Sequence, residues 1–163
     1  MKRKVLFAIC ILAVVLISLL FYKEPAHVIS VAVFPFINES ENPESDWLNS
    51  AIGSGISSRI QAISGCQSGY FSSYLSNIFK SLNIKNNTTM DAVTAARVGK
   101  IIGADYVIFG KYGYDGKNVN ADLNVVNVKK PSESKSICAA SELHNSMDIP
   151  ADLTKKFFKS IDY

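Results

Sequence analysis

The chain is 163 residues long, 48% of them hydrophobic, and its formal net charge is +3. That length accommodates about one domain. Lys2, Arg3 and Lys4 carry the whole excess charge, because 14 basic and 14 acidic residues remain after them. Binding to nucleic acid draws most of its affinity from a positive surface, which this balanced remainder does not supply. The sequence therefore predicts no nucleic-acid partner.

An uncharged apolar run follows the three basic residues, from Val5 to Tyr22. As a helix this run is roughly 27 Å long, close to the hydrocarbon thickness of a bilayer. We interpret residues 1–22 as a membrane anchor with its basic cluster in the cytoplasm. Residues 23–27 then form a linker. Residues 28–163 form one domain in the periplasm or outside the cell, and residues 5–22 hold it at the inner (cytoplasmic) membrane in a single pass.

A cleaved signal peptide is the alternative, and it would release the domain into the periplasm. Such a peptide has a shorter apolar stretch and small residues at the cleavage site, whereas no A-x-A pattern follows Tyr22. A lipoprotein signal is disfavoured, because the bulky Ile9 precedes Cys10 where a small residue is needed. A buried core helix is disfavoured, because the run has no polar face.

The first predicted element of the domain is a buried strand over residues 27–36, rich in Val, Ile and Phe and ended by Pro35. A polar loop follows, and Asp46 predicts the N-cap of a helix over 47–63. Its apolar residues recur every three or four positions: Leu48, Ala51, Ile52, Ile56, Ile60 and Ile63. Gly53-Ser54-Gly55 lies inside this helix. We interpret these glycines as a site of close packing against the sheet and not as a nucleotide-binding loop.

The middle of the chain predicts a turn and a short strand around 65–69, then an amphipathic helix over 71–82. A second helix, capped by Thr88 or Thr89, ends at Gly103, which we expect to be a left-handed cap. Residues 106–109 predict a buried central strand. A phosphate-binding loop would place a strand first and a helix after the glycines, and the order here is the reverse. The glycines of this region are therefore structural.

The last third predicts antiparallel strands and a final helix. Asp115-Gly116 is typical of a type I′ hairpin turn. The strand that follows alternates apolar and polar residues, and a phase slip at Val125-Val126 predicts a bulge or twist. Residues 136–143 predict a third antiparallel strand, and Pro150 starts a last helix. The expected fold is α/β: one compact domain, a mixed sheet with a C-terminal antiparallel hairpin and helices packed on it, preceded by an N-terminal transmembrane helix.

No catalytic, metal or cofactor site emerges from the residues. His27 and His144 lie in unrelated contexts, and the sequence contains no G-x-S-x-G, H-E-x-x-H or C-x-x-C motif. We therefore expect no enzymatic activity and no cofactor. Cys66 and Cys138 leave two alternatives open: a disulfide in an oxidising compartment, or two buried thiols.

Two blocks of the sequence resemble a periplasmic domain superfamily that includes the amino-terminal domain of TolB and the CsgG-like curli-secretion lipoproteins. The first block contains a strand ending in Pro35-Phe36, an Asn-containing loop, Trp47-Leu48 and a helix with small residues. The second, residues 90–128, contains a helix, a Gly-Ala-Asp-Tyr strand and a hairpin. Together the resemblance covers nearly all of residues 28–145.

This resemblance implies a compact α/β domain, an envelope location and a binding role. The relatives include secretion-channel subunits and lipoproteins that activate peptidoglycan synthases. This chain lacks their lipidation motif, the long hairpins that build a CsgG-like barrel and the propeller of TolB, which makes a pore an unfavourable interpretation. Function does not follow from the fold alone.

We therefore predict a non-enzymatic, membrane-tethered envelope protein whose domain binds a protein partner in envelope assembly or secretion, either another envelope protein or a second copy of itself. The expected contact residues lie in the first long loop and at the hairpin tip: Asn38, Glu39, Trp47, Tyr112, Tyr114 and Asp115. Aromatic residues concentrate binding energy, so Trp47 is the first candidate for a contact residue. The alternative is that Trp47 packs against the start of its own helix. Two other functions stay open. One is a small-ligand sensor with a closed polar pocket, and the other is a hydrolase that depends on His27 or His144.

Overall fold

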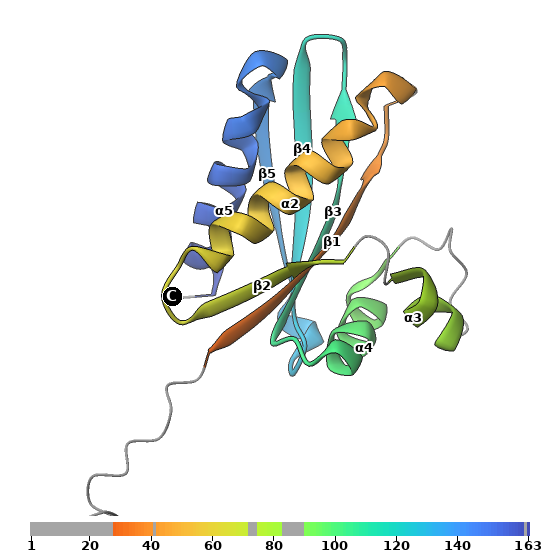
Figure 1. The fold of residues 1–163 in the computed structure, drawn as a ribbon, viewed down its shortest axis with the longest axis vertical. Helices are drawn as coiled ribbons and strands as arrows, with labels where there is room; N and C mark the ends of the chain where they lie inside the picture. The colour runs from red at the N-terminus through yellow and green to blue at the C-terminus, as the bar shows by residue number, and fades with distance from the viewer. Residues whose placement is uncertain (1–27, 41, 72–74, 83–89, 162) are drawn as a thin grey trace, which may run out of the picture.

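A computed structural model describes residues 28–40, 42–71, 75–82, 90–161 and 163. The elements run in the order β1 (Ile29–Asn38), η1 (Pro43–Ser45), α2 (Trp47–Gln61), β2 (Cys66–Tyr70), α3 (Leu75–Ser81), α4 (Ala92–Ile102), β3 (Tyr106–Tyr114), β4 (Asn118–Asn127), η2 (Pro131–Glu133), β5 (Lys135–Glu142), η3 (Leu143–Asp148) and α5 (Ile149–Ser160). They form one α/β domain with a mixed sheet and helices packed on it, as the sequence predicts (Figure 1).

The five strands lie in the order β2-β1-β3-β4-β5. β1 is parallel to both of its neighbours, while β4 is antiparallel to both β3 and β5. The segments predicted as a central strand and a following hairpin are β3 and β4, and the third antiparallel strand is β5. The sheet is therefore parallel on one side of β3 and antiparallel on the other. This agrees with the order along the chain, in which helices separate the first three strands and short turns connect the last three.

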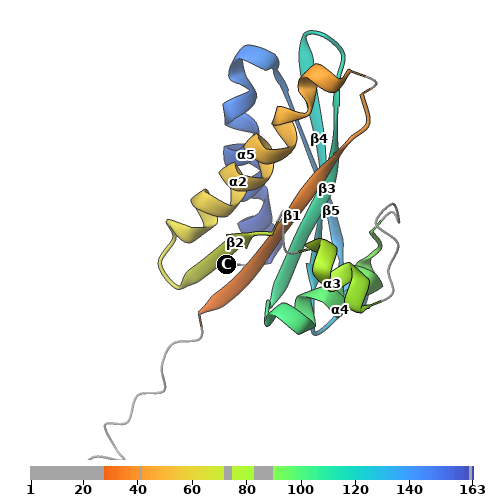
Figure 2. The ribbon, with the colours of Figure 1, turned by 45° about the vertical axis from the view of Figure 1, so that its right-hand side comes forward.

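The two faces of the sheet are covered to different extents (Figures 1 and 2). α2 and α5 pack across one face and bury a core that includes Ile56, Phe157 and Leu123. α4 and α3 cover only part of the other face, where Ala95 and Val107 belong to a second, smaller core. Beyond α4 this second face carries residues that are mostly polar and largely exposed: Asn120, Asp122, Asn124, Ser136, Cys138 and Ala140.

The sheet has two distinct ends. The starts of β1, β2, β3 and β5 lie together with the end of β4, because Ile29 pairs with Cys66, Val31 with Tyr106, and Tyr106 with Asn127. The C-terminal ends of α2, α4 and α5 lie there too (Figure 1). We call this the tether end, after the anchor that the sequence predicts ahead of β1. The opposite end, which we call the loop–hairpin end, holds the loop over 39–46 and the β3–β4 turn over 115–117.

The glycines predicted to be structural have the expected roles, except that Gly55 faces α5 and not the sheet: an added Cβ atom would lie 2.8 Å from Pro150. Gly103 ends α4 in the left-handed conformation, with φ of 72°. A Cβ atom added to Gly53 would lie 2.4 Å from Cε2 of Tyr70 on β2, so this glycine lets α2 approach the sheet closely. The turn after β3 differs from the prediction, because three residues connect the strands where a type I′ turn has two.

One prediction about strand geometry was wrong, and a second was wrong in one of its two alternatives. Pro35 does not end β1 but lies inside it, where the β1–β3 register shifts between Val33 and Phe36. Of the bulge or twist predicted at Val125-Val126, the bulge is absent, because the register with β3 is continuous there. Val125 faces the core under α2 and α5, while Val126 is buried in the core under α4. The phase slip therefore marks the point where the second face also becomes covered.

The helix caps were predicted in part. Asp46 occupies the N-cap position of α2, but its side chain makes no capping hydrogen bond. Asp91 caps α4 instead, since its carboxylate accepts the backbone N–H of Thr94 at 2.6 Å. The predicted capping residues Thr88 and Thr89 lie outside the described residues, as does the start of the predicted 71–82 helix at 72–74.

The predicted anchor, residues 1–22, also lies outside the described residues. In the part of the chain that the structure describes, no helix combines the length and the hydropathy needed to cross a bilayer. The single pass stays a prediction from the sequence. The same holds for the histidine-dependent hydrolase, because neither His27 nor the side chain of His144 is described.

The disulfide left open by the sequence is not formed, and both thiols are free. Cys66 lies on β2 and Cys138 on β5, the two edge strands of the sheet. Four strand spacings of about 4.8 Å separate these edges by roughly 19 Å. A disulfide needs Cα atoms closer than about 7 Å. Nor are both thiols buried, since Cys138 is exposed.

Candidate interaction surface at the loop–hairpin end

The structure brings the two predicted contact segments together. The backbone N–H of Glu39, in the first loop, donates to the carbonyl oxygen of Tyr112 on β3 at 2.8 Å. The Tyr112 hydroxyl donates to the carbonyl oxygen of Ser45 at 3.0 Å. The loop and the hairpin are thus held side by side at one end of the sheet, as Figure 2 shows. The sequence did not predict that the loop and the hairpin lie side by side, because this arrangement depends on the pairing of β1 with β3.

Tyr112 is a structural residue and not a contact residue, contrary to the prediction. Its side chain is 1% exposed and belongs to the main core. Burial raises the pKa of its hydroxyl, and the negative charge of Asp46 raises this pKa further. The hydroxyl therefore stays protonated and keeps donating to the loop across the physiological pH range.

Asn38 organises the loop from its base. Its side-chain nitrogen donates to a carboxylate oxygen of Asp46 at 2.7 Å and to the hydroxyl of Ser45 at 3.0 Å. Its side-chain oxygen accepts the backbone N–H of Ser40 at 2.9 Å. The amide is therefore occupied within the protein. Asn38 shapes the surface that a partner would meet, whereas the prediction made it part of that surface.

Glu39 joins the loop to β3 through an ion pair with Lys111, whose Nζ lies 3.1 Å from the glutamate Oε1. Both side chains are about half exposed, so solvent screens the pair and its contribution to stability is at most about 1 kcal/mol. Glu39 is therefore available to exchange Lys111 for a cation on a partner.

The turn of the hairpin is rigidly built. The Asp115 carboxylate accepts the backbone N–H groups of Lys117 at 2.9 Å and Asn118 at 2.7 Å. These hydrogen bonds, the one from Asn118 foremost, lower the pKa of Asp115 to about 2. The Tyr114 hydroxyl donates to the carbonyl oxygen of Gly116 at 2.7 Å. Asp115 and Tyr114 thus present a fixed shape at the tip.

Two large apolar side chains flank the stem of the loop. Ile37 is 52% exposed and Trp47 is 50% exposed. They directly adjoin Asn38 and Asp46, whose side chains are hydrogen-bonded to each other. Ile37 pairs with Lys111 on the same face of the sheet as α4, in the part of that face that α4 does not cover. Ile37 was not among the predicted contact residues, which began at Asn38.

Acidic residues outnumber basic ones at this end. The described acidic side chains are Glu39, Glu44, Asp46, Asp115, Glu142 and Asp148, and the described basic ones are Lys111 and Lys117. Lys117 pairs with Glu142 at 3.2 Å, as Lys111 does with Glu39. The loop–hairpin end is thus an acidic surface with two exposed apolar side chains, which suits a basic protein partner with an apolar contact.

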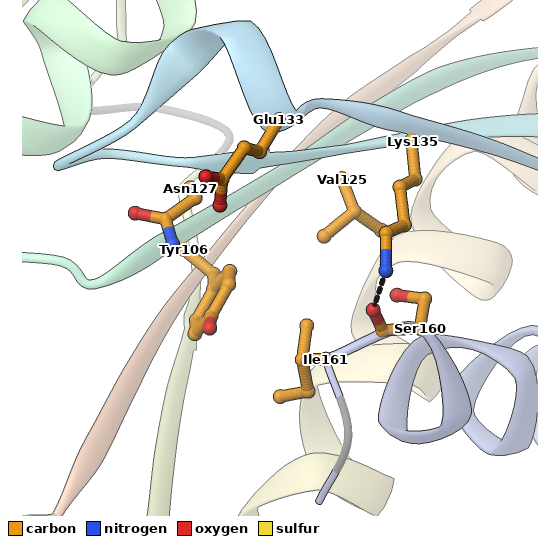
Figure 3. Close-up of a pocket in the computed structure, with 7 residues that line it drawn as sticks. All are labelled: Tyr106, Val125, Asn127, Glu133, Lys135, Ser160 and Ile161. Atoms are coloured by element: carbon orange, nitrogen blue, oxygen red, sulfur yellow. Dashed lines mark hydrogen bonds between the residues drawn. The ribbon is translucent and has the colours of Figure 1, made fainter.

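The cleft drawn in Figure 3 lies at the other end, between the start of β5 and the end of α5. Its volume is about 130 Å³, and the Lys135 ammonium donates to the carbonyl oxygen of Ser160 across it. Ligand pockets usually occupy 300 Å³ or more. This cleft therefore gives the small-ligand sensor no support. The described residues also contain no group of three or more His, Cys, Asp or Glu side chains that could hold a metal ion.

No protein-family model and no curated protein matches the sequence. Several solved structures share the fold. The LpoB C-terminal domain from Salmonella enterica is 13% identical with a TM-score of 0.50, over 76% of this chain and 90% of that one. The PelC dodecamer from Paraburkholderia phytofirmans is 14% identical with a TM-score of 0.51, over 85% and 90%. TolB from Acinetobacter baumannii is 12% identical with a TM-score of 0.52, over 86% of this chain but only 30% of TolB.

The expected resemblance to TolB is therefore confirmed at the level of the fold. At identities this low the likeness extends no further than the fold. The CsgG-like part of the resemblance stays a prediction.

Proposed function

We propose that this chain is a non-enzymatic, membrane-tethered domain of the bacterial envelope, and that its loop–hairpin end binds a protein partner. One observation carries the proposal: the two segments predicted to make contacts converge at a single end, opposite the start of β1. The proposed tether would join the domain at that start. The exposed Ile37 and Trp47 lie at the loop–hairpin end. A tethered domain presents to the periplasm the end that lies farthest from its membrane attachment.

The fold supports an envelope role. LpoB C-terminal domain and PelC are compact domains that this chain matches over most of their length. PelC is a dodecamer, which makes self-assembly the alternative to a foreign partner. The acidic surrounding of Ile37 and Trp47 favours a foreign partner with basic residues, because a second acidic copy docking by the same surface would meet like charges.

Crosslinking from inside the surface tests the proposal. A photo-crosslinking amino acid placed at Trp47 or Ile37 of the full-length protein in cells should capture one dominant envelope protein. The matched control is Val93 on α4, which is 62% exposed but lies away from the loop–hairpin end. A protein that is crosslinked from positions 47 and 37 but not from position 93 supports the loop–hairpin end as the binding surface. Equal captures from all three positions contradict it, and capture of the chain itself points to an assembly.

The tether is tested separately. If residues 1–22 anchor the chain, the full-length protein stays in the membrane pellet after alkaline carbonate extraction. Deletion of residues 1–22 should release it. A shortened mature protein in the soluble periplasmic fraction would instead support a cleaved signal.

A further inference from the structure

The tether end carries exposed apolar side chains that no other part of the described chain covers. Val28 directly precedes β1, Ile101 lies in the last turn of α4, and Tyr163 follows α5, and all three are exposed. Tyr163 is held in place, since its hydroxyl donates to the carbonyl oxygen of Ser64 at 2.6 Å and its ring lies 5.1 Å from that of Phe158. Tyrosine is an amphipathic residue that favours membrane–water interfaces.

The same end is basic, in contrast to the loop–hairpin end. Its described basic residues are Arg59, Lys100, Lys129, Lys130, Lys135 and Lys159, against the acidic Asp105 and Glu133. Lys129 pairs with Asp105 at 3.4 Å and Lys130 with Glu133 at 3.1 Å. Both lysines remain largely exposed, so these pairs are weak. The domain is thus polarised along its length, although its total charge is balanced.

The length of the predicted linker limits how far this end can lie from the membrane. Residues 23–27 connect the predicted anchor to Val28, and five residues span at most roughly 17 Å when fully extended. A linker contracted to about half of that span would bring the start of β1 to within about 8 Å of the headgroups, the screening length at physiological salt. Polybasic surfaces at this distance are attracted to anionic lipid.

We propose that the tether end docks on anionic lipid headgroups of the membrane that holds the chain, with the lysines at the headgroups and Val28, Ile101 and Tyr163 at the interface. This inference rests on the proposed tether and adds to it a fixed orientation. The loop–hairpin end then points away from the membrane. Its acidic side chains are repelled by the same lipids, which opposes the inverted orientation.

Lysine acylation footprinting of the full-length protein in lipid nanodiscs tests this orientation. Neutral nanodiscs are compared with ones that contain about 30% anionic phosphatidylglycerol. Lys129 and Lys117 form a matched pair, because their side chains are 76% and 74% exposed and each has one carboxylate partner. We expect anionic lipid to slow the acylation of Lys129, Lys130 and Lys100 about fivefold and to leave Lys117 unchanged. About 0.5 M salt should remove the protection.

The variants Lys129→Gln and Lys130→Gln, combined, should reduce the protection of Lys100, whereas Lys117→Gln should not. Equal acylation in both nanodiscs, with the protein firmly incorporated, overturns the docking and leaves the tether intact. Failure of the full-length protein to remain in nanodiscs or in carbonate-washed membranes overturns the tether, and the docking with it. Protection of Lys117 together with Lys129 would also overturn the proposed orientation.

Discussion

The hydroxyl of Tyr112 donates a 3.0 Å hydrogen bond to the carbonyl oxygen of Ser45, and this contact joins the centre of the sheet to the first loop. The tyrosine ring is fully buried, while the loop that it holds is at the surface. The shape of the candidate interaction surface therefore depends on a residue that no partner can touch.

Removing that hydroxyl should loosen the loop at little cost to the domain. Tyr112→Phe leaves the carbonyl oxygen of Ser45 without its partner and should lower the free energy of unfolding by about 1 kcal/mol. Hydrogen exchange at the Glu39 amide should quicken. The matched control is Tyr114→Phe, whose hydroxyl bonds only within the exposed turn. If both variants leave exchange at Glu39 unchanged, Tyr112 does not hold the loop.

Substitution by alanine should have very different effects on stability at two glycines of β3. A Cβ atom at Gly110 would lie 2.1 Å from the backbone oxygen of Asp122 and 2.7 Å from the Phe36 ring. Gly110→Ala should therefore destabilise the domain by about 3 kcal/mol, because backbone must move. At Gly113 a Cβ atom would meet nothing within 4 Å, so Gly113→Ala should be near neutral. Urea unfolding measures both, and a harmless Gly110→Ala would contradict the β3–β4 packing.

Trp47 is exposed and its neighbour Leu48 is buried, so mutating each tests whether Trp47 is a contact residue or a packing residue. Leu48 is buried in the main core, so Leu48→Ala should cost about 3 kcal/mol of stability. Trp47→Ala should cost less than about 1 kcal/mol and should weaken capture of the partner. A loss of stability at Trp47 equal to that at Leu48 would favour the alternative, in which this side chain packs the helix start.

The acid titration of Asp115 reports on the hairpin turn. Backbone N–H groups stabilise its ionised form, so its pKa in the folded state is about 2, below the ordinary value of 3.8. This contribution to stability is present above the unfolded-state pKa and is lost as the pH falls through about 2. Carbon NMR of the carboxylate should show that midpoint. A midpoint near 3.8, equal to that of an unstructured aspartate, would mean that the turn is open.

The sequence predicts most elements of this fold because their signals are local. Gly103 ends a helix through its own backbone conformation, and the alternation after Asn118 arises from neighbours along one strand. The misses come from contacts between distant segments. Val126 breaks the alternation of apolar and polar residues because α4 covers it. Pro35 is tolerated within β1 because the register with β3 shifts there.

The exposure of the candidate surface was predicted for Glu39, Trp47 and Asp115 but not for Tyr112 or Ile37. Both segments, the first loop and the hairpin tip, were correctly expected to be surface features. Which side chains are exposed depended on the β1–β3 register, which makes Tyr112 buried and Ile37 exposed. A sequence pattern does not show which of Tyr112 and Ile37 is buried, because both are large, mainly apolar residues that suit a strand.

The position of β1 in the sheet affects how the chain can fold during its synthesis. β1 lies between β2 and β3, and its pairing residues on β3 begin at Tyr106. When the chain emerges from its N-terminus, this apolar strand appears early and must wait for most of the domain before its second edge is paired. β3, β4 and β5 follow one another in sequence and can pair as they emerge. We expect a chaperone to bind nascent β1, because an apolar strand with an open edge is prone to aggregate.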